Sequence, residues 1–317
     1  MEIFKKIGII GGSGNVGSHI AFLAAMRGIA KRIIVHSIDI PRCKGVSLDV
    51  SQAACILNLP TQVESCETLE GLKDCEVIIM SAGLPRTPNM TREDLLLKNA
   101  QILKDTMREI ATIAPDSFII VVSNPLDVMT YVAKQISAFP KERIIGMAGV
   151  LDSARLGYEI KQSLADYHTS VSPLVIGGHG DDMLPLTRYS LVNDKTLDEI
   201  FDEQTLSHII KETKNGGAKI VNYYQRGSAY FAPATAVIKM LEVILYDSQE
   251  VLSCSVYLEG EYGLNDLCMG VPVKLGKKGV VQIVTLNLSQ QEQERLNISA
   301  EGIRKQIKIL ADNHLFD

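Results

Sequence analysis

A histidine framed by glycines is the strongest candidate for acid–base chemistry in this sequence. His179 lies in the segment Ile176-Gly177-Gly178-His179-Gly180-Asp181, directly after an apolar run. A histidine exchanges protons near neutral pH, and a buried carboxylate beside it would raise its pKa and fix its tautomer. Asp152 is our candidate for that carboxylate. Asp152 and Arg155 are three residues apart at the start of a predicted helix and share one face, although this spacing alone is more typical of a surface salt bridge.

Polar side chains also follow two predicted strands. Arg86 and Arg92 lie in a loop framed by Gly and Pro after strand 76–80, and Asn124 follows strand 118–122. Ligands of open α/β sheets bind at the carboxyl ends of the strands. A guanidinium can bind a carboxylate through two hydrogen bonds, and such a loop could close over a substrate. Asn124 could orient a substrate and a nicotinamide ring, although Asn before Pro is also a common turn signal.

A glycine-rich turn points to a dinucleotide. Gly12, Gly14 and Gly17 form G-x-G-x-x-G between the predicted strand 7–10 and a helical pattern over 15–28. The first glycine permits a tight turn, the second lets the backbone approach a pyrophosphate, and the third lets helix and strand pack closely. The helix N-terminus offers free N–H groups to the anion. The residues predicted to contact the dinucleotide here are Gly12, Ser13, Gly14, Asn15, Val16 and Gly17.

The end of the second strand decides between NAD and NADP. The dinucleotide pattern places an acidic residue there, about 20 residues beyond the last glycine, to bind the adenosine ribose. Asp39 has the right distance from Gly17, but the strand ends two positions earlier, at Ser37. With Ser37 at the ribose, the carboxylate that repels a 2′-phosphate is displaced, and Arg42 could accept that phosphate. We expect NAD, with NADP or dual use left open, and the role of Cys43 nearby undetermined.

The elements that must position these residues fall into two parts. Short apolar runs alternate with longer helical patterns up to about residue 147, which predicts an α/β fold with a Rossmann-type, doubly wound parallel sheet. A mixed α+β region follows. We expect a dinucleotide-binding domain over 1–147 and a substrate-binding, catalytic domain over 148–317. The expected strands are 7–10, 32–36, 76–80, 118–122, 143–146, 251–258, 271–274 and 280–286, and the expected helices are 152–165, 205–215, 218–247 and 290–310.

Composition excludes several classes of protein. The 317 residues carry 32 basic and 37 acidic side chains, a net charge of −5. The chain therefore produces no positive long-range electrostatic field that would attract a nucleic acid. The apolar runs are far shorter than a membrane span, and the N-terminus lacks the pattern of a secretory signal. Six scattered cysteines form no C-x-x-C pair, and no His, Asp or Glu spacing indicates a metal site. We expect a cytoplasmic protein without metal, nucleic-acid or membrane partners.

Taken in order, five motifs resemble the malate/lactate dehydrogenase family, and the resemblance covers nearly the whole chain. They are GGSGNVG, AGLPRTPNMTR, VSNPLD, GVLDSAR and GGHGD. The resemblance implies that His179 exchanges the proton, that Asp152 orients it, and that Arg155 binds the substrate carboxylate. Arg92 would polarise the reacting carbonyl and Asn124 would hydrogen-bond the substrate. It also implies coenzyme contacts at Ser37, Asp39, Asn99, Val122, Ser123 and Asn124.

The resemblance distinguishes two substrate classes at Arg86. Glutamine at this place is typical of the lactate branch, and arginine is typical of the malate branch, here most like lactate-dehydrogenase-like malate dehydrogenases. Oxaloacetate carries a second carboxylate that would be unpaired in a closed site unless a cation meets it. The implied reaction is hydride transfer between (S)-malate and NAD, by a homotetramer or homodimer. A lactate or other 2-hydroxy-acid dehydrogenase, and a dinucleotide-binding protein without catalysis, are the alternatives.

Overall fold

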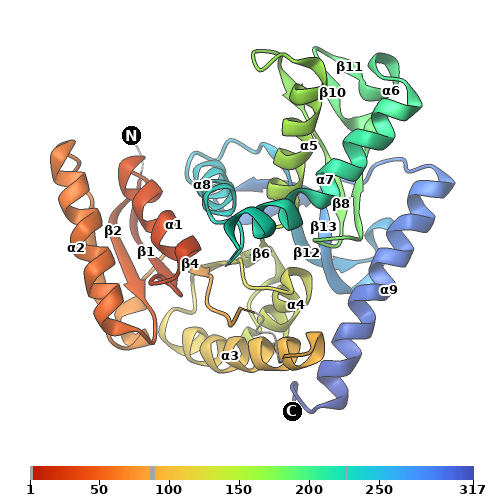
Figure 1. Ribbon diagram of the computed structural model, residues 1–317. Coiled ribbons are helices and arrows are strands. Elements are labelled where there is room, and N and C mark those ends of the chain that lie inside the picture. The colour runs from red at the N-terminus through yellow and green to blue at the C-terminus, as the bar shows by residue number, and fades with distance from the viewer. Residues whose placement is uncertain (1–2, 86–89, 226) are drawn as a thin grey trace.

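The first half of the computed structural model is a parallel α/β unit. The structure describes residues 3–85, 90–225 and 227–317. The strands are β1 (Phe4–Ile10), β2 (Ala30–His36), β3 (Gln62–Cys66), β4 (Val77–Met80), β5 (Phe118–Val121) and β6 (Ile144–Gly146). The helices are α1 (Asn15–Met26), α2 (Ile40–Ile56), α3 (Arg92–Ile113) and α4 (Leu126–Ser137). The six strands pair in parallel in the order β3-β2-β1-β4-β5-β6, so the expected doubly wound Rossmann-type sheet is confirmed (Figure 1).

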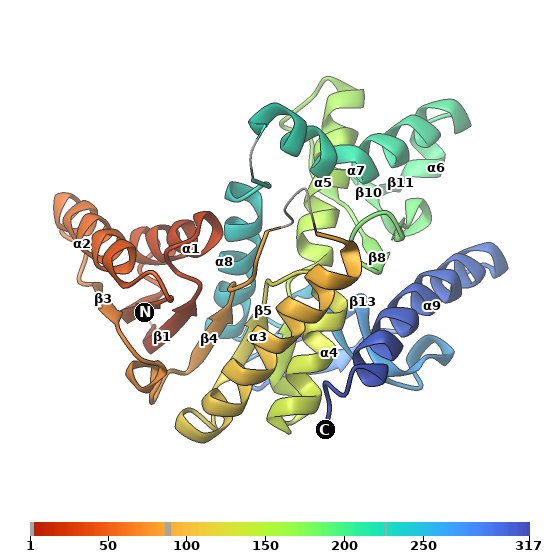
Figure 2. The same cartoon turned by 60° about the horizontal axis from the view of Figure 1, so that its bottom comes forward.

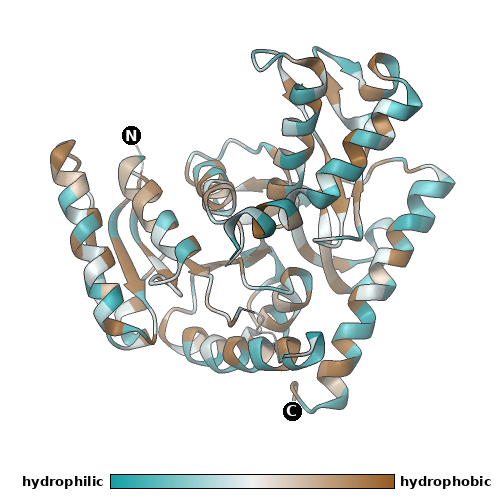
Figure 3. Ribbon diagram, in the orientation of Figure 1, coloured by the Kyte–Doolittle hydropathy of each residue, from teal (hydrophilic) through white to brown (hydrophobic). Residues whose placement is uncertain are grey.

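The central strands are hydrophobic because helices cover both faces of the sheet. All four residues of β4 are buried, and so are the last three of β5. Their Val and Ile side chains suit a pleated surface that packs on two sides. Helix α1 packs beside α2 and α8 (Phe231–Leu245), while α3 packs beside α4 (Figure 2). Figure 3 shows the strands largely brown while the helices alternate between teal and brown, as expected for amphipathic helices around an apolar sheet.

The second half adds antiparallel strands and longer helices. The remaining strands are β7 (Val171–Ser172), β8 (Val175–Gly177), β9 (Met183–Pro185), β10 (Leu191–Val192), β11 (Lys195–Thr196), β12 (Val251–Glu259), β13 (Asn265–Gly276) and β14 (Gly279–Ile283). The remaining helices are α5 (Gly149–Leu164), α6 (Leu197–Ile200), α7 (Glu203–Tyr224), α8 and α9 (Gln290–Asp312). Short 3-10 turns occupy Leu69–Leu72, Lys141–Arg143, Thr187–Tyr189 and Glu261–Gly263. The expected mixed α and β character of this half is confirmed.

One sheet runs through both halves of the chain. Strand β12 continues the sheet beside β6 through the antiparallel pair Ser255 and Gly146, and β13, β8 and β9 follow. Strands β7, β10 and β11 form a separate small sheet. Within the parallel part, the strand order reverses between β1 and β4, which opens a crevice at the carboxyl ends of the strands. The segments that follow β1, β4 and β5 therefore reach the same edge.

Several local predictions were wrong. The expected helix 218–247 is not one element, because residues 218–224 belong to α7 and α8 begins at Phe231. Strand β3 was not expected, because the edge segment Gln62–Cys66 alternates polar and apolar residues and lacks an apolar run. We also expected a helix break at Gly216 and Gly217, but α7 continues through them to Tyr224. A Cβ added at either glycine would lie within 3.5 Å of the Arg155 side chain, so glycine leaves room for that arginine inside a helix despite its low helix propensity. Among the described residues, no helix is long and apolar enough to cross a bilayer.

Candidate active site

The glycine-rich turn fits a dinucleotide pyrophosphate. A Cβ added at Gly12 would lie 2.3 Å from Val35 Cγ1, and one at Gly17 would lie 2.5 Å from the carbonyl oxygen of Gly11. Only glycine therefore fits these two positions without a shift. Helix α1 begins after an extended Gly14, and it has neither a side-chain cap nor an acidic residue in its first turn. Its first N–H groups are thus available to an anion, and the exposed backbone of Gly14 gives that anion close access.

The end of β2 presents a serine to the glycine-rich turn. The hydroxyl oxygens of Ser37 and Ser13 are 2.6 Å apart, and the backbone N–H of Asp39 donates to Ser37 Oγ at 3.0 Å. The Asp39 carboxylate instead accepts the backbone N–H of Arg42 at 3.1 Å and caps α2. The two candidates for the ribose position are thereby separated, because Ser37 lies against the glycine-rich turn while Asp39 caps a helix.

A histidine, a carboxylate and a guanidinium form the chemical centre. His179 Nδ1 lies 2.9 Å from Asp152 Oδ2, and Arg155 Nη1 donates to Asp152 Oδ1 at 3.1 Å. Helix α5 supplies both partners from positions three residues apart, and the turn after β8 supplies the histidine. The Asp152 side chain is 3% exposed, whereas His179 and Arg155 are each 17% exposed. The carboxylate is therefore buried behind two groups that still reach the cavity.

The charge of Asp152 controls the proton affinity of the imidazole. Burial by itself lowers the pKa of His179, but the charge and hydrogen bond of Asp152, with a smaller contribution from Asp127, raise it above its ordinary value of 6.5. Because Nδ1 lies against the carboxylate, the other ring nitrogen, Nε2, is left to exchange a proton with a ligand. This is an arrangement in which a buried carboxylate stabilises the charged form of a general acid.

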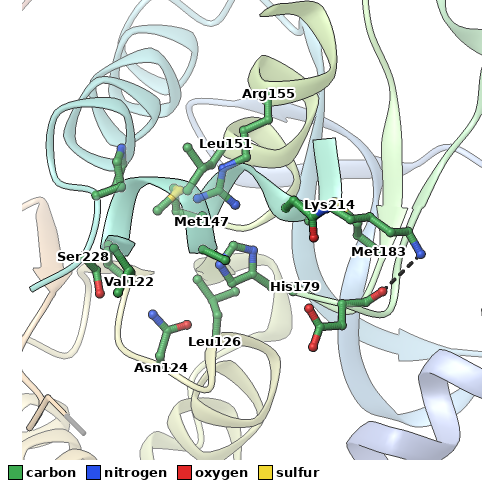
Figure 4. Close-up of a pocket in the computed structure, with 18 of the residues that line it drawn as sticks. Val122, Asn124, Leu126, Met147, Leu151, Arg155, His179, Met183, Lys214 and Ser228 are labelled. Carbon is green, nitrogen blue, oxygen red and sulfur yellow. Dashed lines mark hydrogen bonds between the residues drawn. The ribbon is translucent and has the colours of Figure 1, made fainter. Parts of the chain in front are cut away.

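His179 and Arg155 line a cavity of about 360 Å³ between the two halves of the chain. Figure 4 shows Arg155 extending from α5 toward His179, with Asn124 below and Met147 and Leu151 behind. Residues of α1, α7 and α8 complete the wall, so coenzyme-binding and substrate-binding elements face one space. The lining residues are Val16, Val122, Asn124, Leu126, Met147, Leu151, Arg155, His179, Gly180, Asp181, Met183, Lys214, Asn215, Gly217, Ala218, Val221, Ser228, Ala229 and Pro233.

The segment after β5 is braced from α3. Asn99 is 3% exposed, and its side-chain amide donates to the backbone oxygen of Asn124 at 2.9 Å. Its carbonyl oxygen accepts the N–H of Leu84 at 2.7 Å. The Asn99 side chain thus ties the segment after β4 to the segment after β5. Asn124 is exposed and lines the cavity together with the buried Val122, whereas Ser123 is buried and does not line it.

The two arginines of the loop after β4 are placed differently. Arg92 is the first residue of α3, is exposed, and does not line the cavity. Its helix begins with a capping box between Thr91 and Asp94, which fixes where the helix starts. Arg86 lies outside the described residues. A contact of either arginine with substrate therefore stays a prediction.

Three cavity or near-cavity residues were missed in the sequence. Lys214 on α7 lines the cavity, and its amine donates to the backbone oxygen of Asp181 at 3.1 Å. Gly217 lines it as well, and a Cβ there would lie 3.3 Å from Arg155 Nη2, so glycine makes room for the guanidinium. Asp127 is buried and accepts the backbone N–H of His179 at 2.7 Å. The adjacent glycines were a signal for the second of these, and the motif VSNPLD contained the third.

The chain matches known proteins over nearly its full length. Residues 5–146 match the family model described as lactate/malate dehydrogenase, NAD binding domain, and residues 149–313 match lactate/malate dehydrogenase, alpha/beta C-terminal domain. The malate dehydrogenase of Helicobacter hepaticus is 60% identical over 313 residues, which are 99% of each chain. That of Aliarcobacter butzleri is 44% identical over 309 residues, or 98% of each chain.

Solved structures of related enzymes share the fold. The malate dehydrogenase of Cryptosporidium parvum superposes with a TM-score of 0.93 at 36% identity, covering 98% of this chain and 100% of that one. The lactate dehydrogenase of Eimeria maxima, solved with NADH and oxamate, has a TM-score of 0.93 at 33% identity, covering 98% and 95%.

Proposed function

The chain belongs to the lactate/malate dehydrogenase family, and we propose that its reaction is reversible hydride transfer between (S)-malate and NAD, giving oxaloacetate and NADH. It is an NAD-dependent oxidoreductase. The observation that carries the proposal is the contact of His179 with Asp152 beside Arg155 in one cavity. Relatives that are 44–60% identical over nearly the full chain are malate dehydrogenases, which supports the choice of substrate.

The coenzyme is proposed to span the carboxyl edge of the parallel sheet, within residues 1–147. Its pyrophosphate would meet the turn from Gly12 to Gly17, and its nicotinamide would lie by Val122, Ser123 and Asn124 at the mouth of the cavity. Asn99 would act indirectly, by holding the two segments that face the ring. When bound, the reduced nicotinamide supplies the hydride. Residues 148–317 would then provide the substrate side of the site.

The substrate side follows from the charges in the cavity. Arg155 would bind the carboxylate next to the reacting carbon through two hydrogen bonds, since its planar guanidinium still reaches the cavity. His179 Nε2 would give its proton to the carbonyl oxygen as hydride reaches the carbonyl carbon, and would take that proton back during oxidation. Asp152 stabilises the charged imidazole throughout. Asn124 would donate a hydrogen bond to the substrate oxygen.

The loop arginines set the proposed specificity. Arg92, exposed at the start of α3 here, would approach the carbonyl oxygen when substrate is bound. Arg86 would pair with the second carboxylate of oxaloacetate, because an unpaired charge in a closed site costs several kcal/mol, roughly. With pyruvate, Arg86 would itself be unpaired, so the same residue rejects the smaller substrate. A lactate or other 2-hydroxy-acid dehydrogenase is the competing proposal.

Substrate preference with a matched variant tests this proposal. We expect the purified protein to oxidise NADH much faster with oxaloacetate than with pyruvate, and Arg86→Gln to shift that preference toward pyruvate. A variant that keeps its preference for oxaloacetate would show that Arg86 does not select the substrate. A wild-type protein that prefers pyruvate would favour the lactate alternative.

Coenzyme selectivity is proposed to be modest. Ser37 and Ser13 would bind the adenosine ribose with hydroxyl groups, and the Asp39 carboxylate is engaged at the start of α2. A 2′-phosphate therefore meets no carboxylate at the end of β2. We expect NADPH to bind measurably and Ser37→Asp to weaken NADPH by at least about tenfold more than NADH, measured by fluorescence titration. Equal weakening of both coenzymes would place the ribose elsewhere.

We propose that the active form is a homodimer or homotetramer in the cytoplasm. Helix α2 exposes Leu48 by 61% and Ile56 by 80%, and Tyr223 and Phe231 are exposed by 81% and 56% where α7 ends and α8 begins. Such exposed apolar side chains are typical of surfaces covered by another subunit.

The six cysteines are all free, which suits a reducing compartment. Light scattering tests the oligomer, and a monomer at micromolar concentration would contradict it.

A further inference from the structure

The turn that carries His179 is held by buried side chains from outside the cavity. The backbone N–H of Gly178 donates to Ser299 Oγ on α9 at 2.8 Å. The backbone N–H of His179 donates to Asp127 Oδ2 on α4 at 2.7 Å. Successive peptide groups are thus anchored to two different helices, so the position of the imidazole depends on more than Asp152.

Asp127 is the unusual anchor because it is a buried acid. It is 5% exposed, and its second oxygen, Oδ1, accepts the hydroxyl of Ser255 on β12 at 2.7 Å. Ser255 is fully buried. A buried carboxyl group costs free energy unless its oxygens find partners, and here each oxygen has one. A serine at position 127 could accept the backbone N–H of His179, as Ser299 accepts that of Gly178. Hydrogen bonding alone therefore does not explain why residue 127 is an acid.

We propose that Asp127 is a positioning residue for the proton donor, which fixes the backbone of His179 and places a second negative charge beside the imidazole, in addition to Asp152. The inference rests on the proposed role of His179. Asp152 contacts the ring through Nδ1, Asp127 contacts the backbone of the same residue, and the charges of both carboxylates raise the pKa of the imidazole. Opposite charges this close favour the protonated ring.

Among the described residues, charged groups from several segments face the imidazole. Helix α5 contributes Asp152 and Arg155, helix α4 contributes Asp127, Asp181 and Lys214 line the same cavity, and Asp182 lines a neighbouring hollow with His179 and Asp127. Arg155 lowers the pKa of His179, which makes a second acid useful as a counterweight. Burial raises the pKa of Asp127, and the hydrogen bonds from the His179 backbone and from Ser255 act against that shift. The Ser255 hydroxyl therefore helps to keep Asp127 charged.

Two variants separate the charge of Asp127 from its shape. Asp127→Asn keeps an oxygen for the His179 N–H and an amide for Ser255, but removes the charge. We expect the pH midpoint of oxaloacetate reduction to fall by about one unit, with KM and NADH affinity within about twofold of wild type. Ser255→Ala removes only the hydroxyl that stabilises the carboxylate, so its midpoint should lie between those of wild type and Asp127→Asn.

Ser253→Ala is the matched control. Ser253 is 4% exposed on the same strand, and its hydroxyl donates to the backbone oxygen of Val175 rather than to an acid. Loss of this hydroxyl removes a buried hydrogen bond of similar kind, so it reports the effect of a general loosening of β12. We expect its pH midpoint to equal that of wild type.

The pH midpoint is also read without turnover, by NMR titration of labelled histidine with the His179 signal assigned from its loss in His179→Asn. The proposal predicts the order wild type, Ser255→Ala, Asp127→Asn from highest to lowest midpoint in both readouts. A folded Asp127→Asn protein with the wild-type midpoint would overturn it. If that variant does not fold, an unchanged midpoint in Ser255→Ala overturns it. A wild-type protein that titrates normally but does not reduce oxaloacetate would refute the proposed function instead.

Discussion

Replacement of Asp152 by asparagine tests the electrostatic account of the proton donor. The carboxylate is 3% exposed and lies 2.9 Å from His179 Nδ1, so its charge is little screened by water. Two unit charges about 4 Å apart interact by roughly 4 kcal/mol at an effective dielectric constant of about 20. Loss of this attraction therefore lowers the pKa of His179.

The direction of the pH effect follows from the role of the proton. In the proposed mechanism, reduction needs protonated His179, so its rate falls as pH rises through the histidine pKa, which Asp152 raises. In Asp152→Asn this midpoint moves down, and kcat/KM for oxaloacetate at neutral pH should fall by roughly 10²–10³. The loss should shrink as pH is lowered below the midpoint of the variant.

The assay is NADH oxidation with oxaloacetate over a pH series, and NADH affinity is measured separately by fluorescence. Asp166→Asn is the control, because Asp166 lies just past the end of α5 and its carboxylate contacts only Thr169 and His168. A loss of less than about tenfold, or an unchanged pH midpoint in Asp152→Asn, would refute the assignment of Asp152 to the imidazole.

Three further variants examine other parts of the account. His179→Asn should lower kcat by at least about 10³ while NADH affinity stays within about twofold in titration, because the imidazole acts on the proton and not on the dinucleotide. Gly217→Ala places a Cβ about 3.3 Å from Arg155 Nη2, so KM for oxaloacetate should rise several-fold with a smaller change in kcat. Unchanged steady-state kinetics would mean that the guanidinium can move aside without loss of substrate binding. Ile79→Ala empties a fully buried position in β4 and should lower the free energy of unfolding by about 2–5 kcal/mol, measured in urea.

Features set by neighbouring residues in the chain were predictable from the sequence. The glycine-rich turn was found because strand, turn and helix succeed one another within residues 4–26, and the lack of space for a Cβ at Gly17 agrees with the close packing predicted for it. The positive φ of the turn, however, lies at Gly11 and not at Gly12, to which the tight turn was assigned. The parallel sheet was found because strands buried on both faces show as apolar runs. The pairing of Asp152 with His179 came from the resemblance together with the chemistry of the two groups.

Features set by tertiary contacts were not predictable in the same way. Strand β3 has no apolar run because it is an edge strand, so nothing in its local pattern distinguished it from a loop. The acid at 127 acts through a backbone N–H 52 residues away, a contact that leaves no periodic signal in either segment. The position of Asp39 was ambiguous for a related reason, since only the structure shows its carboxylate at the start of α2 rather than at the glycine-rich turn.

The most direct test of the proposed function compares two substrates with one preparation of the wild-type protein. NADH oxidation is followed by its absorbance, with oxaloacetate in one series and pyruvate in the other. The account predicts a strong preference for oxaloacetate, because the proposed roles of Arg155 and Arg86 provide one cation for each carboxylate of the substrate. A preference for pyruvate would leave the family and the roles of His179 and Asp152 standing, but would contradict the assignment of malate as the substrate.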